Sequence, residues 1–139
     1  MKKVVLTLLV ILAVLAFSSC QLEIVFNEIA GTWLFSDSST LFLMYDENYP
    51  DEIIFDIGLG YDADADTYGY YCFGDGAISS NTITGTYGYN TPGDETGEDK
   101  EITLTLTLSR DGKLTVKAQG EGPLNGKTFN DGVLQAIPE

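Results

Sequence analysis

The chain has 139 residues and a formal net charge of −14 at pH 7, with seven basic residues, 21 acidic residues, two cysteines and no histidine. Such an excess of carboxylates repels phosphate backbones, which argues against nucleic acid as a partner. The lack of histidine excludes Ser-His-Asp and Cys-His nucleophile pairs and most zinc sites, so any catalysis would depend on carboxylates.

The first twenty residues have the order of an export signal. Lys2 and Lys3 precede an unbroken apolar run over 4–17, and small residues follow up to Cys20. A charged start, an apolar centre and a small-residue cleavage site are the three parts of a secretory signal peptide. The apolar run is shorter than the ~20 residues of a membrane-spanning helix. We therefore expect export rather than a transmembrane anchor.

The run Phe17-Ser18-Ser19-Cys20 resembles the lipobox of bacterial lipoproteins. The resemblance implies a signal peptide over 1–19 and fatty acyl chains such as palmitate on Cys20. Residues 20–30 would then be a lipidated N-terminus with a short tether, and 31–139 the folded domain. The lipid would attach the protein to the cell envelope, at the outer membrane or the cell surface. A secreted or uncleaved form is the alternative.

Loss of the signal peptide would remove Lys2 and Lys3 and take the net charge from −14 to −16. The remaining 120 residues fit one domain, which can hold a core without disulfides. If Cys20 is acylated, Cys72 has no partner. We expect Cys72 to be a small buried hydrophobe, with an intermolecular disulfide as the alternative.

Short strands are predicted from the first third of the domain onward. A helical turn near 27–30 leads into a strand over 31–35, and 40–45 is apolar on both faces. From 53 to 61 every second residue is apolar, which is the period of a strand with one buried face. The polar run 62–66 is a hairpin tip, and 67–73 is the returning strand. Asp56 is out of phase with the apolar positions, so we expect it to be exposed.

The second half of the chain is also predicted to consist of short strands joined by turns and loops. Gly74-Asp75-Gly76 has the composition of a tight turn. Residues 82–89 have the composition of a strand, and residues 90–99 have that of a long exposed loop. Over 101–118 the apolar pattern selects a hairpin with a three-residue loop at 110–112, because this register faces Leu108 to Leu114. Residues 119–126 read as a loop, and 128–137 as one or two closing strands.

The sequence thus predicts an all-β fold, a small antiparallel meander barrel of about eight strands, with a β-sandwich as the alternative. Glycines within the strands favour the barrel, because a small barrel coils its strands strongly. The residues expected to face inward are Trp33, Phe35, Ile53, Phe55, Ile57, Leu59, Ile102, Leu104, Leu106, Leu108, Leu114 and Val116.

The run Phe26 to Trp33, with Gly31-Thr32-Trp33 at its end, resembles the start of the lipocalin and wider calycin families. In those families a short helical turn leads into Gly-x-Trp on the first strand. The resemblance implies a barrel with Trp33 closing one end and a lumen that binds a small apolar molecule. The Gly-x-Trp triplet also resembles the first strand of avidin-type barrels. Ligand identity does not carry over, because no further motif of either family is present.

Two groups of residues are candidate sites. Aromatic side chains near strand glycines can form a ligand platform, although tyrosine is also a common strand residue. The tentative ligand-binding residues are Trp33, Tyr61, Tyr68, Tyr70, Tyr87 and Tyr89. At the hairpin tip, Asp62, Asp64 and Asp66 alternate and could supply oxygen ligands to calcium, the alternative being a solvated tip that prevents edge pairing.

These features predict a membrane-anchored lipoprotein that binds or carries a small apolar ligand without catalysis and without a cofactor. The alternative is a packed structural or protein-interaction lipoprotein of the envelope that has no ligand. The bulk of the inward-facing residues favours a lumen with little free space. A carboxylate-based hydrolase is a third and more distant hypothesis.

Overall fold

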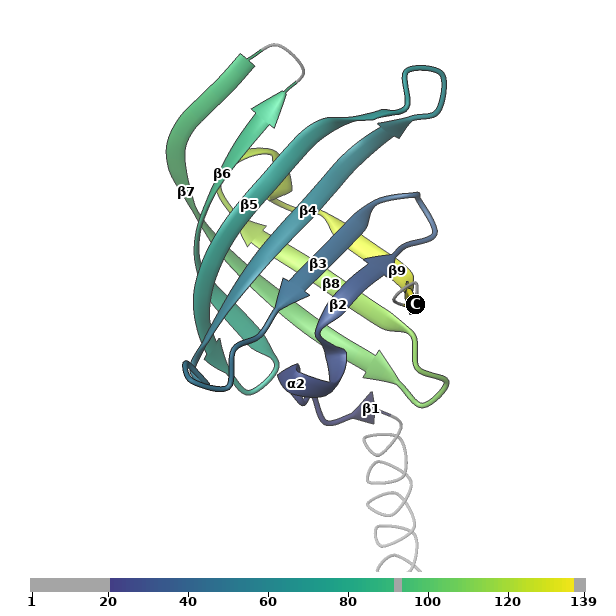
Figure 1. Ribbon diagram of the computed structural model, residues 1–139, viewed down its shortest axis with the longest axis vertical. Coiled ribbons are helices and arrows are strands. Elements are labelled where there is room, and N and C mark those ends of the chain that lie inside the picture. The colour runs from purple at the N-terminus through teal and green to yellow at the C-terminus, as the bar shows by residue number, and fades with distance from the viewer. Residues whose placement is uncertain (1–20, 92–93, 137–139) are drawn as a thin grey trace, which may run out of the picture.

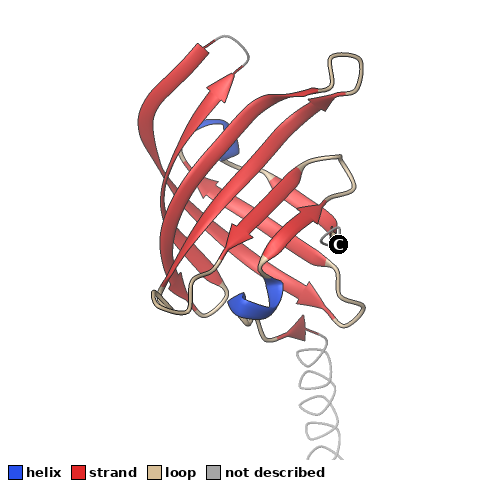
Figure 2. Cartoon of the chain, in the orientation of Figure 1, coloured by secondary structure: helices blue, strands red, loops and turns tan. Residues whose placement is uncertain are grey.

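The computed structural model describes residues 21–91 and 94–136, which fold into a closed antiparallel β-barrel (Figures 1 and 2). Eight strands, β2 to β9, pair with their neighbours in chain order, and β9 closes the barrel against β2. The strands are β1 (Gln21–Leu22), β2 (Gly31–Leu34), β3 (Thr40–Met44), β4 (Glu52–Asp62), β5 (Thr67–Ser79), β6 (Thr82–Thr91), β7 (Asp94–Ser109), β8 (Leu114–Gly120) and β9 (Thr128–Leu134). Two short helices, α2 (Phe26–Ile29) and η1 (Gly122–Leu124), accompany them. The small meander barrel is therefore confirmed over the sandwich.

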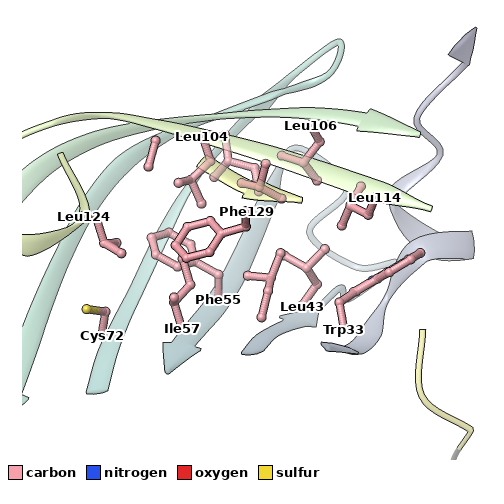
Figure 3. Close-up of a cluster of buried hydrophobic side chains, with 14 of the residues drawn as sticks. Trp33, Leu43, Phe55, Ile57, Cys72, Leu104, Leu106, Leu114, Leu124 and Phe129 are labelled. Carbon is pink, nitrogen blue, oxygen red and sulfur yellow. The ribbon is translucent and has the colours of Figure 1, made fainter. Parts of the chain in front are cut away.

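The predicted inward face is the barrel core. Eleven of the twelve side chains expected there are buried, and Leu108 is only partly buried. Buried side chains from several strands meet inside the barrel (Figure 3). Phe35, which directly follows β2, and Phe129 on the neighbouring strand β9 have ring centroids 5.4 Å apart. Burial of these side chains removes their apolar area from water, which is the main stabilising term of such a fold.

The hairpin between β7 and β8 has the predicted register. Leu108 faces Leu114, and Leu106 faces Val116. The Ser109 amide donates to the Lys113 carbonyl at 2.9 Å, and Gly112 has φ +80°. A three-residue loop with a left-handed glycine is thus present, as the apolar pattern required.

The predicted turn at Gly74-Asp75-Gly76 is wrong, because β5 continues through it to Ser79. These glycines serve close packing rather than a turn. A Cβ added at Gly74 would lie 2.3 Å from the Thr86 carbonyl oxygen on β6, and one at Gly85 would lie 2.0 Å from the Asp75 carbonyl oxygen. Only residues without a side chain allow β5 and β6 to approach and coil this tightly.

The predicted long loop over 90–99 is also wrong. β6 continues to Thr91 and β7 begins at Asp94, and Asn90 pairs with Glu95. Together with β4 and β5, these strands rise beyond the rest of the barrel (Figure 1). The hydrogen bonds between paired strands join backbone groups and do not require apolar side chains, so composition alone misled the prediction. Residues 119–126, predicted as a loop, contain η1.

Residues 21–30 are part of the folded unit rather than a free tether. Gln21 pairs with Ser109, and Leu22 with Leu108, at the end of the barrel that carries α2. Phe26 and Ile29 are buried against the core. The signal peptide and Cys20 lie outside the described residues. Within the described ranges, no helix has the length and apolar character needed to cross a bilayer.

Candidate functional site

One end of the barrel is closed by Trp33 and α2. The Trp33 side chain is 3% exposed, and its indole N–H donates to the Ile29 carbonyl at 2.8 Å. Phe26 and Ile29 of α2 cover the same end, and Figure 3 shows Trp33 at one extreme of the buried cluster. Trp33 therefore lies in the position of a plug, where a bound ligand could not reach it without displacing α2.

The opposite end is closed by Leu124 of η1. Leu124 is fully buried near Cys72, at the other extreme of the cluster in Figure 3. The Tyr87 hydroxyl fixes η1 from below, because it donates to the Glu121 carbonyl at 2.5 Å and accepts from the Leu124 amide at 3.1 Å. Burial raises the pKa of the Tyr87 phenol, so this group stays protonated at neutral pH. With both ends closed, the protein's own side chains occupy the lumen.

The six aromatic candidates do not form one platform. Tyr70 faces inward beside Leu59 on the neighbouring strand, and its ring lies 5.9 Å from that of Tyr89. Tyr61 and Tyr68 instead lie on the outer face, with their ring centroids 5.1 Å apart. The predicted alternation from 53 to 61 breaks at Gly60, whose φ of +65° turns the strand and moves Tyr61 away from the inward set.

Tyr70 borders a hollow at the upper rim of the barrel. It measures about 420 Å³ and is lined by Asp37, Ser39, Leu59, Gly60, Tyr70, Pro123 and Lys127. Because Tyr87 and Leu124 close the barrel at this end, the hollow is a feature of the rim and not an entrance to an internal cavity.

The outer face of β3, β4 and β5 carries a more apolar cleft of about 380 Å³, which we call the outer cleft. Its lining residues are Thr32, Thr40, Phe42, Asp56, Ile57, Gly58, Tyr71, Cys72 and Phe73. The strand register explains its shape. Phe42 lies opposite Asp56, and Asp56 lies opposite Phe73, so two aromatic side chains flank one carboxylate. With strands ~4.8 Å apart, the Cα atoms of Phe42 and Phe73 are separated by about 10 Å.

In the neighbouring row of paired residues, Gly58 forms the floor of the outer cleft. Gly58 lies between Thr40 and Tyr71, and a Cβ there would lie 2.9 Å from the ring of Tyr68. Tyr68 therefore covers Gly58, and its ring meets that of Tyr71 edge-on at 5.5 Å. The aromatic surface thus continues from the cleft up the outer face to the β4–β5 hairpin, where Tyr61 donates to Asp66 at 2.7 Å.

Asp56 is the one carboxylate among the residues that line the outer cleft. It is exposed by overall area, as its phase predicted, yet burial of its carboxyl between neighbouring side chains raises its pKa. Among the residues whose side chains the structure describes, none forms a hydrogen bond or ion pair with this carboxylate. A partly desolvated carboxylate without a partner is destabilising, and a bound donor or cation would relieve this cost.

The three aspartates of the β4–β5 tip serve local hydrogen bonds. Asp62 accepts from the Asp64 amide at 3.0 Å, and Asp66 accepts from the Tyr61 hydroxyl. In the described part of the chain, no three acidic or sulfur-bearing side chains are grouped to hold a metal ion. The arrangement gives the calcium hypothesis no support and fits an ordered, solvated tip.

Cys72 lies on β5, directly opposite Ile57, and is 1% exposed. Burial raises the pKa of its thiol to about 12. A thiol that stays protonated is neither a nucleophile nor a metal ligand at neutral pH. The prediction of a small buried hydrophobe is confirmed for Cys72.

Sequence reasoning missed the outer cleft because Phe42 and Phe73 were treated as ordinary strand residues. The distribution of charge along the sequence could have pointed to this half of the barrel. The segment 4–99 contains no lysine or arginine, and all five basic residues after the leader lie from Lys100 onward. The half of the barrel formed by β2 to β6 therefore carries acidic charge and no basic charge. Comparison with protein-family models, curated proteins and solved structures finds no match to this chain.

Proposed function

We propose that the protein is a lipid-anchored, non-enzymatic binding module of the bacterial envelope, with its ligand in the outer cleft rather than in the lumen. The observation that carries the proposal is the contrast between the two sides of the β-sheet. Inside, Trp33 and Leu124 close both ends of a packed core. Outside, Phe73 and Tyr71 remain 46% and 45% exposed beside a hollow of the size that small molecules occupy.

The position of the chain's N-terminal part supports membrane anchoring through Cys20. Gln21 is paired with Ser109 at the α2 end of the barrel, and Cys20 is the next residue. Consecutive Cα atoms are ~3.8 Å apart, so acyl chains on Cys20 would hold this end close to the bilayer. The β4–β5 and β6–β7 hairpins would then point away from the membrane, and the outer cleft would face sideways into the surrounding water.

Substitution of the acylated residue tests the anchor. Cys20→Ser is expected to give a larger, unlipidated precursor, because the thiol that receives the diacylglyceryl group is lost. Mass spectrometry and membrane fractionation report the change. Cys72→Ser is the matched control, since a buried thiol takes no part in anchoring. An unchanged mass and membrane fraction for Cys20→Ser would contradict the proposed lipidation.

An uncharged lipophilic dye tests the cleft on the full chain in a non-ionic detergent. Removing both flanking rings, in Phe42→Ala with Phe73→Ala, is expected to weaken dye binding by about tenfold, because the ligand loses most of its apolar contact area. Val133→Ala on β9 removes a side chain that is 49% exposed but lies outside the cleft, and it should have no effect. Equal dye binding by both variants would refute the outer cleft as the site.

A partner protein is the second candidate function. The exposed apolar surface continues below the outer cleft to Met44 and Ile54, which are opposite each other and 50% and 49% exposed. Contiguous exposed apolar surface is typical of interaction sites. Met44→Asp with Ile54→Asp should abolish capture of an envelope protein if this function is correct, and should leave dye binding in the cleft unchanged.

A further inference from the structure

The charges around the outer cleft are all of one sign. Asp56 lies in the cleft, and a second hollow of about 380 Å³ on the other side of Phe73 is lined by Asp56, Asp75 and Asp99. Neither hollow is lined by lysine or arginine. The segment 21–91, which forms β1 to β6, contains twelve acidic residues and no basic one. A cleft in this field concentrates cations and repels anions.

Asp56 and the rings beside it form a specific arrangement within that field. Its carboxylate lies between Phe42 and Phe73 on adjacent strands and has no partner among the described residues. A Cβ at Gly88 would lie 3.2 Å from the Phe73 ring, so this ring lies beside Gly88 on β6, and Phe73 and Asp56 both line the outer cleft. Aromatic faces attract ammonium groups, and a partly desolvated carboxylate attracts them more strongly than one in bulk water.

We propose that the outer cleft binds a small organic ammonium compound, whose cationic head pairs with the Asp56 carboxylate and whose apolar body lies between Phe42 and Phe73. This inference rests on the proposed function and adds the chemical class of the ligand. The volume of the cleft matches a small molecule, and an uncharged or anionic ligand would leave Asp56 desolvated without compensation.

Two probes of the same shape separate the ligand class from simple apolar binding. Phenethylammonium carries the cation, and phenethyl alcohol is its uncharged analogue. Isothermal titration of the full chain in a non-ionic detergent should show about tenfold tighter binding of the ammonium probe. Asp56→Asn, which preserves shape, should remove this preference and leave the alcohol's affinity unchanged. Glu101→Gln, on β7, makes the same charge change three strands away and should alter neither affinity.

The outcomes distinguish the inference from the function on which it rests. If both probes bind equally and Asp56→Asn has no effect, while Phe73→Leu weakens both, the cleft is a binding site and the cation inference is overturned. If neither probe binds, or if Phe73→Leu has no effect on binding, the small-molecule function of the outer cleft fails and the inference fails with it. Binding of a lysine-rich peptide alone would overturn the small-molecule ligand in favour of a protein.

Discussion

Removal of one oxygen atom, in Tyr87→Phe, tests whether η1 is fixed over the barrel as the geometry indicates. The variant loses the bond to the Glu121 carbonyl and leaves the buried Leu124 amide without an acceptor. An unsatisfied buried donor costs roughly 1–3 kcal/mol, and a lost hydrogen bond roughly 0.5–1.5 kcal/mol. We therefore expect the free energy of unfolding to fall by about 2 kcal/mol. For a urea m-value of ~1.5 kcal/mol/M, the midpoint should fall by roughly 1 M with no change in slope.

Urea denaturation followed by circular dichroism measures this shift, with Tyr49→Phe as the control. Tyr49 is 64% exposed, so loss of its hydroxyl should change stability by less than ~0.5 kcal/mol. Gly122→Ala should reproduce the defect, because a Cβ there would lie 2.4 Å from the Tyr87 hydroxyl oxygen and Gly122 has φ +71°. A Tyr87→Phe effect as small as that of Tyr49→Phe would refute the role of the hydroxyl in holding η1.

Three further predictions concern charge, reactivity and orientation. Because the folded state raises the pKa of Asp56, the ionised carboxylate opposes folding, and Asp56→Asn should be more stable than the parent at pH 7. This difference in the free energy of unfolding should disappear near pH ~3, where the carboxyl is protonated in both the folded and the unfolded state. A constant difference between pH 3 and pH 7 would contradict the stated cause. The Cys72 thiol, with a pKa of about 12, should resist alkylation by iodoacetamide at pH 8 until urea unfolds the chain, and rapid labelling of the native protein would be inconsistent with its burial. In vesicles, nitroxide lipid headgroups should quench a fluorophore at Lys113→Cys, near the α2 end, more than one at Ala63→Cys on the β4–β5 tip. The eleven residues of the tilted strand β4 run between these two ends and separate them by roughly 25 Å. Equal quenching would contradict the proposed orientation.

The parts of the fold that sequence predicted correctly are those in which local pattern and packing agree. In the hairpin of β7 and β8, alternating leucines and a left-handed glycine at 112 select one register, and the structure has it. The expectation that Trp33 closes one end of the barrel came from the resemblance of residues 26–33 to the start of the lipocalin and calycin families, and Trp33 is buried there. The errors at 74–76 and 90–99 have a common cause. Glycine and polar residues are frequent in turns, but here the glycines allow strands to approach closely and the polar residues belong to paired strands.

The candidate site was only partly predictable. Tyrosines were identified as the surface to examine, yet Gly60 sends Tyr61 outward while Tyr70 stays inward. The aromatic residues that flank Asp56 come from strands separated in the chain, and only pairing of β3, β4 and β5 brings Phe42 and Phe73 to its two sides. A pattern of period two specifies which residues share a face, but it does not specify which strands are neighbours.

The sequence by itself determined the alternation that buries one face of each strand, the acidic character of the first half of the domain, and the lack of histidine, because these properties depend on residue type and spacing alone. The tertiary structure decided that the lumen is filled, that both ends are closed, and that an unpartnered carboxylate lies between two rings on the outer face. These features arise where side chains from distant parts of the chain meet, and their meeting depends on lateral strand register, barrel closure and one left-handed glycine.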